Sequence, residues 1–141
     1  MSTLLVLPSE DPGQESVLDR FLDRGVPATV VIAEPGAGSA SARICSAINE
    51  MKPTAPLTVI AFGESALALP AVALSQRTAH RLVAEYVLID PALPAVTESW
   101  PDARVMVVTD DADCQASLQG RLRGWTVIGH AEFDQWSPDD Q

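Results

Sequence analysis

Short apolar runs alternate along the chain with longer stretches in which apolar residues recur every three or four positions. The apolar runs predict six strands, at residues 3–7, 28–33, 57–62, 86–89, 104–108 and 125–128. The stretches with helical spacing predict helices at residues 15–24, 39–51, 65–81 and 113–121. The run at 57–62 (LTVIAF) is apolar almost throughout, which is typical of a strand covered on both faces.

Strands and helices that alternate in this way favour an α/β fold with a parallel sheet. We expect a three-layer sandwich: an all-parallel six-stranded sheet in the order 2-1-3-4-5-6, with helices on both faces. Ligands of such sheets bind at the carboxyl ends of the strands, near the point where the strand order reverses. Candidate functional residues are therefore expected in the loops that follow the strands.

The composition indicates one globular domain. The chain has 141 residues and is 47% hydrophobic, and it has no linker that would divide residues 1–141. No basic and then apolar leader precedes Leu4, and no apolar run approaches the roughly 18 residues of a membrane span. Cys45 and Cys114 lie far apart and suit two free thiols in a reducing compartment. We therefore expect a cytoplasmic protein.

The charge of the chain is strongly negative. Its formal net charge is −10 and its pI is about 4.4, so it repels phosphate backbones and anionic lipids. Nucleic acid and membrane are therefore excluded as first candidates for a partner. The sequence leaves open whether the chain forms a homodimer.

The loop after the buried strand at 57–62 is the most informative of the loops. Gly63 permits a tight turn, which would lift the Ser65 hydroxyl above the sheet. The N–H of Ala66 would face the same space as an oxyanion donor, at the positive end of the following helix. The alternative interpretation is that Ser65 caps that helix, a common use of serine.

Other loops carry a resemblance to a known family. Residues 35–39 (PGAGS) resemble the Pro-Gly-His-Gly-x-Ser loop of many α/β-hydrolases, and residues 87–91 (VLIDP) are similar to the strand that follows the nucleophile helix there. Three aspartates follow the fifth strand at 110–113, and His130 follows the last strand, in the Ser, Asp, His order of that family. The resemblance runs from residue 3 to about residue 136. It implies a truncated, lidless member that lacks the first two strands.

The resemblance implies a role for each of these side chains. Ser65 would be the nucleophile, His130 the base, and Asp113 the acid that orients the imidazole. Asp111 is the alternative acid, while Asp110 stays open as loop polarity or a cap. We expect no cofactor, and no metal either, because the aspartate loop shows no helper ligands.

The oxyanion hole departs from the family pattern. Pro8 stands where the family commonly has a His-Gly pair, and proline has no N–H to donate. Besides Ala66, the second oxyanion donor would therefore have to be Ser9 or Glu10.

The implied activity is that of a small serine hydrolase, an esterase or thioesterase. Its substrate would be a small acyl ester or thioester, either free or presented by a carrier. Two residues oppose it: Leu67 would crowd the turn at the nucleophile, and Pro70 would distort the helix behind it. The rival interpretation is a catalytically silent hydrolase-like domain that binds a partner or small ligand. A nucleotide-binding module is a third alternative, although Glu10 and Asp11 would repel a phosphate.

Overall fold

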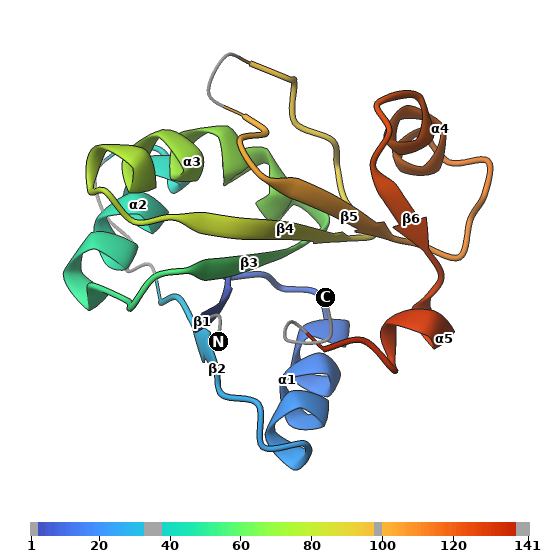
Figure 1. Ribbon diagram of the computed structural model, residues 1–141, viewed down its shortest axis with the longest axis horizontal. Helices are drawn as coiled ribbons and strands as arrows, with labels where there is room; N and C mark the ends of the chain where they lie inside the picture. Colours follow the sequence, from blue (N-terminus) through green and yellow to red (C-terminus); the bar gives the residue numbers. More distant parts are fainter. Residues whose placement is uncertain (1–2, 33–37, 98–99, 138–141) are drawn as a thin grey trace.

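The computed structural model describes residues 3–32, 38–97 and 100–137 (Figure 1). The strands are β1 (Thr3–Val6), β2 (Ala28–Val30), β3 (Leu57–Phe62), β4 (Val83–Ile89), β5 (Arg104–Val108) and β6 (Thr126–Ile128). The helices are α1 (Gly13–Asp23), α2 (Ala40–Met51), α3 (Leu69–Thr78), α4 (Gln115–Leu122), α5 (His130–Phe133) and the 3-10 helix η1 (Gly63–Ala68). Strands and helices alternate, except that no helix lies between β4 and β5 in the described part of the chain.

The six strands form one sheet in the order β2-β1-β3-β4-β5-β6. Every neighbouring pair is parallel, with Leu5 opposite Val59 and Ile60 opposite Val87. Both the strand order and the all-parallel arrangement confirm the prediction from the hydrophobic pattern. The order reverses between β1 and β3, so the carboxyl end of β3 lies at the point where such sheets bind ligands.

Helices cover the sheet on both sides. Figure 1 shows α2, α3 and α4 over one face and α1 with α5 over the other. All six residues of β3 are buried, which confirms that this strand is covered on both faces. The three-layer arrangement thus follows from the continuous apolar run at the centre of the sheet.

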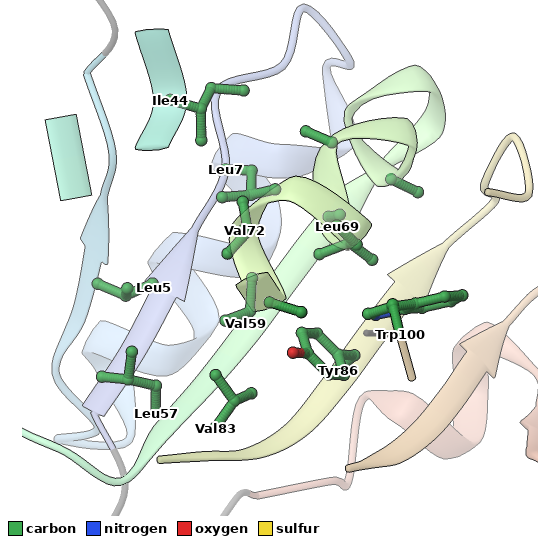
Figure 2. Packing of buried hydrophobic residues seen from close by; sticks show 14 of the residues in the cluster. Leu5, Leu7, Ile44, Leu57, Val59, Leu69, Val72, Val83, Tyr86 and Trp100 are labelled. Carbon is green, nitrogen blue, oxygen red and sulfur yellow. The ribbon is translucent and has the colours of Figure 1, made fainter. Parts of the chain in front are cut away.

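The larger core lies on the face of α2 and α3, and the aromatic side chains of Tyr86 and Trp100 pack in it (Figure 2). The described residues of the crossover from β4 to β5 form no helix, and Trp100 of this crossover has no exposed surface. The Trp100 ring lies 5.8 Å from Tyr86 and 5.5 Å from Trp125, both in edge arrangements. The Tyr86 hydroxyl donates a hydrogen bond of 2.6 Å to Asp102. Burial and this hydrogen bond both raise the pKa of Tyr86 far above its ordinary value.

The helix boundaries correct one expectation. We predicted a single helix from residue 65 whose path Pro70 would distort, but residues 63–68 form the 3-10 helix η1 and α3 starts at Leu69. Pro70 therefore lies in the first turn of α3, where no backbone N–H is needed inside the helix.

The strand boundaries also differ from the prediction. β4 starts at Val83 rather than at residue 86, because the polar Glu85 interrupts the apolar run while its backbone still pairs with β3 and β5. β2 ends at Val30, and residue 33, where we expected its end, lies outside the described residues.

Two features predicted from composition can be compared with the described residues. Within residues 3–32, 38–97 and 100–137, none of the helices combines the length and the apolar character that a membrane crossing needs. Cys45 and Cys114 are free and half-buried. Burial raises the pKa of the Cys45 thiol, and a hydrogen bond with Ser75 partly offsets that effect.

Trp100 should carry much of the stability of the helix-free crossover. Trp100→Ala should lower the free energy of unfolding by about 3–5 kcal/mol, because it removes a fully buried ring and leaves a cavity. Leu122, which is 79% exposed, supplies the control: Leu122→Ala should change stability by less than about 0.5 kcal/mol. Urea denaturation measures both. Similar losses for the two variants would mean that the ring does not anchor the crossover.

Candidate active site

The carboxyl edge of the sheet gathers the polar residues that the sequence singled out. Ser65 follows β3, the 110–113 loop follows β5 and His130 follows β6. Asp90, which follows β4, joins them at the same edge. Residues 35–37 of the PGAGS loop lie outside the described residues.

Gly63 makes the turn from β3 into η1. Its φ is +53°, in the left-handed region that glycine enters without strain, and an added Cβ would meet no atom within 4 Å. The requirement for glycine is therefore conformational rather than steric. The Gly63 carbonyl accepts a hydrogen bond of 3.0 Å from Ala92, which ties the turn to the loop after β4.

Ser65 is held by a contact across the sheet. Its hydroxyl donates a hydrogen bond of 2.5 Å to the carbonyl of Pro8, at the end of β1. Ser65 lies inside η1, whose N-cap is Phe62, and the cap of α3 is Ala68. The alternative interpretation of Ser65 as a helix cap is therefore wrong. Its hydroxyl instead links η1 to the loop after β1 through the Pro8 carbonyl.

Two hollows flank Ser65. One of about 530 Å³ lies between the β1 and β3 loops and is bordered by the carboxylates of Glu10, Asp11 and Glu64. The other, of about 410 Å³, lies toward α2 and has the apolar side chains of Ile44 and Leu67 in its wall. Leu67 is 52% exposed, so it borders the second hollow and does not crowd the turn.

Of the two expected oxyanion donors, Ser9 borders the first hollow and Ala66 borders neither hollow. The Ser9 N–H has no hydrogen-bond partner among the described residues. The Ser9 hydroxyl accepts a hydrogen bond of 3.0 Å from the N–H of Asp11. Ala66 follows Ser65 within η1 and is fully buried.

His130 is fixed by two carboxylates at the first residue of α5. Its backbone N–H donates to Asp110 over 2.9 Å, and its ring Nε2 lies 2.8 Å from Oδ2 of Asp90. An ionised carboxylate only accepts hydrogen bonds, so the tautomer that pairs with an ionised Asp90 has its proton on Nε2 and leaves Nδ1 as the acceptor. Gly129 permits the approach, since an added Cβ there would lie 2.9 Å from Oδ1 of Asp110.

The two predicted acids, Asp111 and Asp113, contact each other within the 110–113 loop rather than the His130 ring. The Asp111 carboxylate accepts a 2.9 Å hydrogen bond from the N–H of Asp113, so it closes a local turn. Asp113 is exposed, and no hydrogen bond or ion pair joins either residue to His130 among the described residues. Asp110 contacts the His130 backbone rather than its ring.

Sequence reasoning did not assign a role to Asp90, the residue that the structure pairs with the His130 ring. A signal was present, since Asp90 ends the buried run VLID and is the first polar residue after β4. Its φ of 44° is unusual for a residue other than glycine, and strained backbone of this kind often accompanies functional sites.

Ser65 and His130 are not joined directly in this structure. The Ser65 hydroxyl donates to Pro8 and the His130 ring pairs with Asp90, and no hydrogen bond links the two side chains. The order of the strands determines how far apart Ser65, Asp90 and His130 lie along the edge of the sheet. Asp90 follows β4, the immediate neighbour of the strand that precedes Ser65.

Cys114 stands beside the aspartate loop as the cap of α4. Its Sγ accepts a hydrogen bond from the N–H of Ser117 and lies 3.8 Å from the Thr109 hydroxyl. Desolvation raises the pKa of the thiol, but hydrogen bonds from Ser117 and Thr109 outweigh it and lower the pKa overall. Within the described ranges, no three His, Cys, Asp or Glu side chains are arranged to hold a metal ion.

The conformation of Gly63 can be tested directly. Gly63→Ala should destabilise the fold by about 1–2 kcal/mol, because an alanine at φ +53° meets the left-handed penalty. Gly63→Asn is the matched control and should cost less, since asparagine enters this region more easily. Urea denaturation gives both values. An asparagine penalty as large as that of alanine would show that space, and not backbone conformation, selects glycine here.

Comparison of the chain with protein-family models, with curated proteins and with solved structures found no match. The resemblance to the α/β-hydrolases therefore rests on the residues quoted above and on their order along the chain. A function for this edge of the sheet has to follow from its own geometry and chemistry.

Proposed function

We propose that this chain is a small serine hydrolase that cleaves an ester or thioester of a short acyl group, with Ser65 as nucleophile and His130 as base. The observation that carries the proposal is the 2.8 Å pairing of His130 with Asp90. It brings an imidazole from β6, at the edge of the sheet, within reach of a residue that follows β4, one strand from Ser65. Neighbouring strands lie about 4.8 Å apart, so the pairing with Asp90 holds the ring closer to Ser65 than the position of β6 alone would.

Asp90 takes the role of the acid in this proposal, in place of Asp113. A carboxylate bound to one ring nitrogen fixes the tautomer and stabilises the imidazolium that forms during acyl transfer. Asp90 has this contact through Nε2. The proton of Ser65 would then go to Nδ1.

The reaction would follow the usual course of acyl transfer. The Ser65 hydroxyl turns from the Pro8 carbonyl toward His130, its oxygen bonds to the acyl carbon, and its proton passes to Nδ1. The leaving alcohol or thiol takes that proton as its bond to the acyl carbon breaks. Water then attacks the acyl-enzyme by the same route and releases the acid. The Ser9 N–H, which has no partner in the described part of the chain, supports a role as oxyanion donor, and Ala66 would be the second.

The two hollows beside Ser65 suggest the substrate class. Ile44, Leu67 and Ala68 give the 410 Å³ hollow an apolar wall suited to a short acyl chain. Glu10, Asp11 and Glu64 border the other hollow, and they would disfavour an anionic leaving group. Small neutral esters and thioesters fit both conditions.

One observation favours a second candidate function, a catalytically silent domain of the same fold that binds a small ligand or partner. The Ser65 hydroxyl donates to Pro8, so in this structure its proton is not directed at a base. If that hydrogen bond persists with substrate present, Ser65 is a structural link between η1 and β1.

Kinetics of single variants distinguish these functions. Wild-type protein should hydrolyse p-nitrophenyl acetate above the buffer rate, and His130→Ala and Asp90→Asn should each lower the rate by about 10²–10⁴-fold. Asp113→Asn is the matched control, because it makes the same chemical change on an exposed aspartate without contact to His130, and its rate should stay near wild type.

Three results would contradict the proposal. A wild-type rate no higher than that of buffer, with short esters and thioesters alike, would favour the silent domain. Activity that survives His130→Ala would remove the proposed base. A larger loss in Asp113→Asn than in Asp90→Asn would return the role of the acid to the 110–113 loop. Thermal midpoints for each variant separate lost chemistry from lost folding.

A further inference from the structure

A further hollow of molecular size lies apart from the two hollows beside Ser65. It has a volume of about 610 Å³, within the roughly 300–1,000 Å³ range of small-molecule sites. It opens over β4, β5 and β6, and the side chains of Glu85, Met106 and Ile128 lie in it. It reaches from Arg104 and Thr126, the first residues of β5 and β6, to Ile128, the last residue of β6, and Glu132 of α5.

The hollow lies on the face of the sheet opposite the crossover from β4 to β5. Trp100 of the crossover packs with Tyr86 on the face of α2 and α3. The opposite face of the sheet is covered by α1 and α5, whose core includes Met106 and Ile128. From α5 and the residues after it, Glu132, Gln135 and Trp136 border the hollow. The sheet is thus only partly covered here.

A buried carboxylate forms part of the floor. Glu85 is 6% exposed, and its carboxylate accepts no hydrogen bond from any described residue. Its one ion-pair partner in the described ranges is Arg104, at 4.0 Å, beyond hydrogen-bond reach. The Arg104 side chain is 60% exposed, so solvent screens its charge. Burial raises the pKa of Glu85, and Arg104 only partly opposes that effect.

The Glu85 carboxylate has little contact with solvent and no close ion-pair partner among the described residues, and a bound cation would give it a direct partner. The other walls suit an organic ligand. Trp125 and Trp136 line the hollow with Met106. Indole rings attract cations, and the Trp136 indole stands on the same face of the sheet as Met106.

We infer that this hollow is a binding site for a small organic cation, an ammonium group joined to an apolar or aromatic body, with Glu85 as its counter-ion. The ammonium group would donate to the Glu85 carboxylate, and the apolar body would lie against Trp136 and Met106. Glu132, at the rim, adds a second and weaker attraction because it is exposed. The site is independent of the proposed hydrolysis, since it shares no residue with the hollows beside Ser65.

Three matched probes test the ligand class. The probes are 2-phenylethylammonium, its neutral analogue 2-phenylethanol and the anion phenylacetate, each titrated to millimolar concentration into the full chain labelled with ¹⁵N. The chain has three tryptophans, so each indole N–H gives one resolvable signal. The ammonium probe should shift the Trp136 signal and bind at least about tenfold more tightly than the alcohol, because a charge-assisted hydrogen bond is lost in the alcohol.

Single variants test the role of Glu85. Glu85→Gln, which nearly preserves shape, should abolish the preference for ammonium over alcohol. Glu132→Gln is the control and should weaken ammonium binding by no more than about threefold, as expected for an exposed charge. Ser65→Ala should bind the ammonium probe like wild type, so a failure of the hydrolase proposal leaves this result intact.

Other outcomes would overturn the inference. These are equal binding of the three probes, a preference for phenylacetate, unchanged selectivity in Glu85→Gln, or no shift of the Trp136 signal. Signals that move with protein concentration instead of probe would show that a second copy of the chain covers the hollow. Thermal midpoints confirm that each variant is folded.

Discussion

Burial of β3 on both faces is the constraint on which the rest of this structure depends. Each residue from Leu57 to Phe62 is buried, so the strand needs helices above and below and parallel neighbours on both sides. Parallel pairing then sends every strand end to the same edge. Ser65, Asp90 and His130 come from three different strands, yet they share that edge because the sheet has one direction.

Within that edge, two hydrogen bonds define the state of the site. The Ser65 hydroxyl donates to Pro8 on the side of β1, while His130 is held toward β4 by Asp90. Ser65, the proposed nucleophile, and His130, the proposed base, are therefore hydrogen-bonded to different partners. Catalysis on this account requires the release of Ser65 from Pro8, whereas Gly63 is fixed by its backbone conformation and the His130 backbone is held by Asp110.

The sequence predicted the sheet well because its strands are continuous apolar runs, and strand order follows from their alternation with helices. The prediction of element boundaries failed where a single residue does not fit the hydrophobic pattern around it. Glu85 concealed the start of β4, since a buried carboxylate cannot be distinguished from a loop residue by pattern alone. Pro70 was assigned a distorting role because the 3-10 segment before α3 leaves no mark in the periodicity.

The candidate site was predictable in its location but not in its contacts. Ser65 and His130 follow strands, so the edge could be named from the sequence. The partner of His130 could not, because it depends on how far each loop carries a side chain across neighbouring strands. The backbone N–H of Asp113 donates to Asp111 within the same loop. Asp90 follows a strand two positions from β6, and its carboxylate pairs with the His130 ring.

The most direct test of the account is covalent labelling of the native protein by a fluorophosphonate, read by mass spectrometry of its peptides. The account predicts one adduct, on Ser65, because only a serine activated by a base reacts readily with this probe. The adduct should be absent from Ser65→Ala and should form much more slowly in His130→Ala. An unmodified Ser65 in folded wild-type protein, or an adduct that forms equally fast without His130, would contradict it.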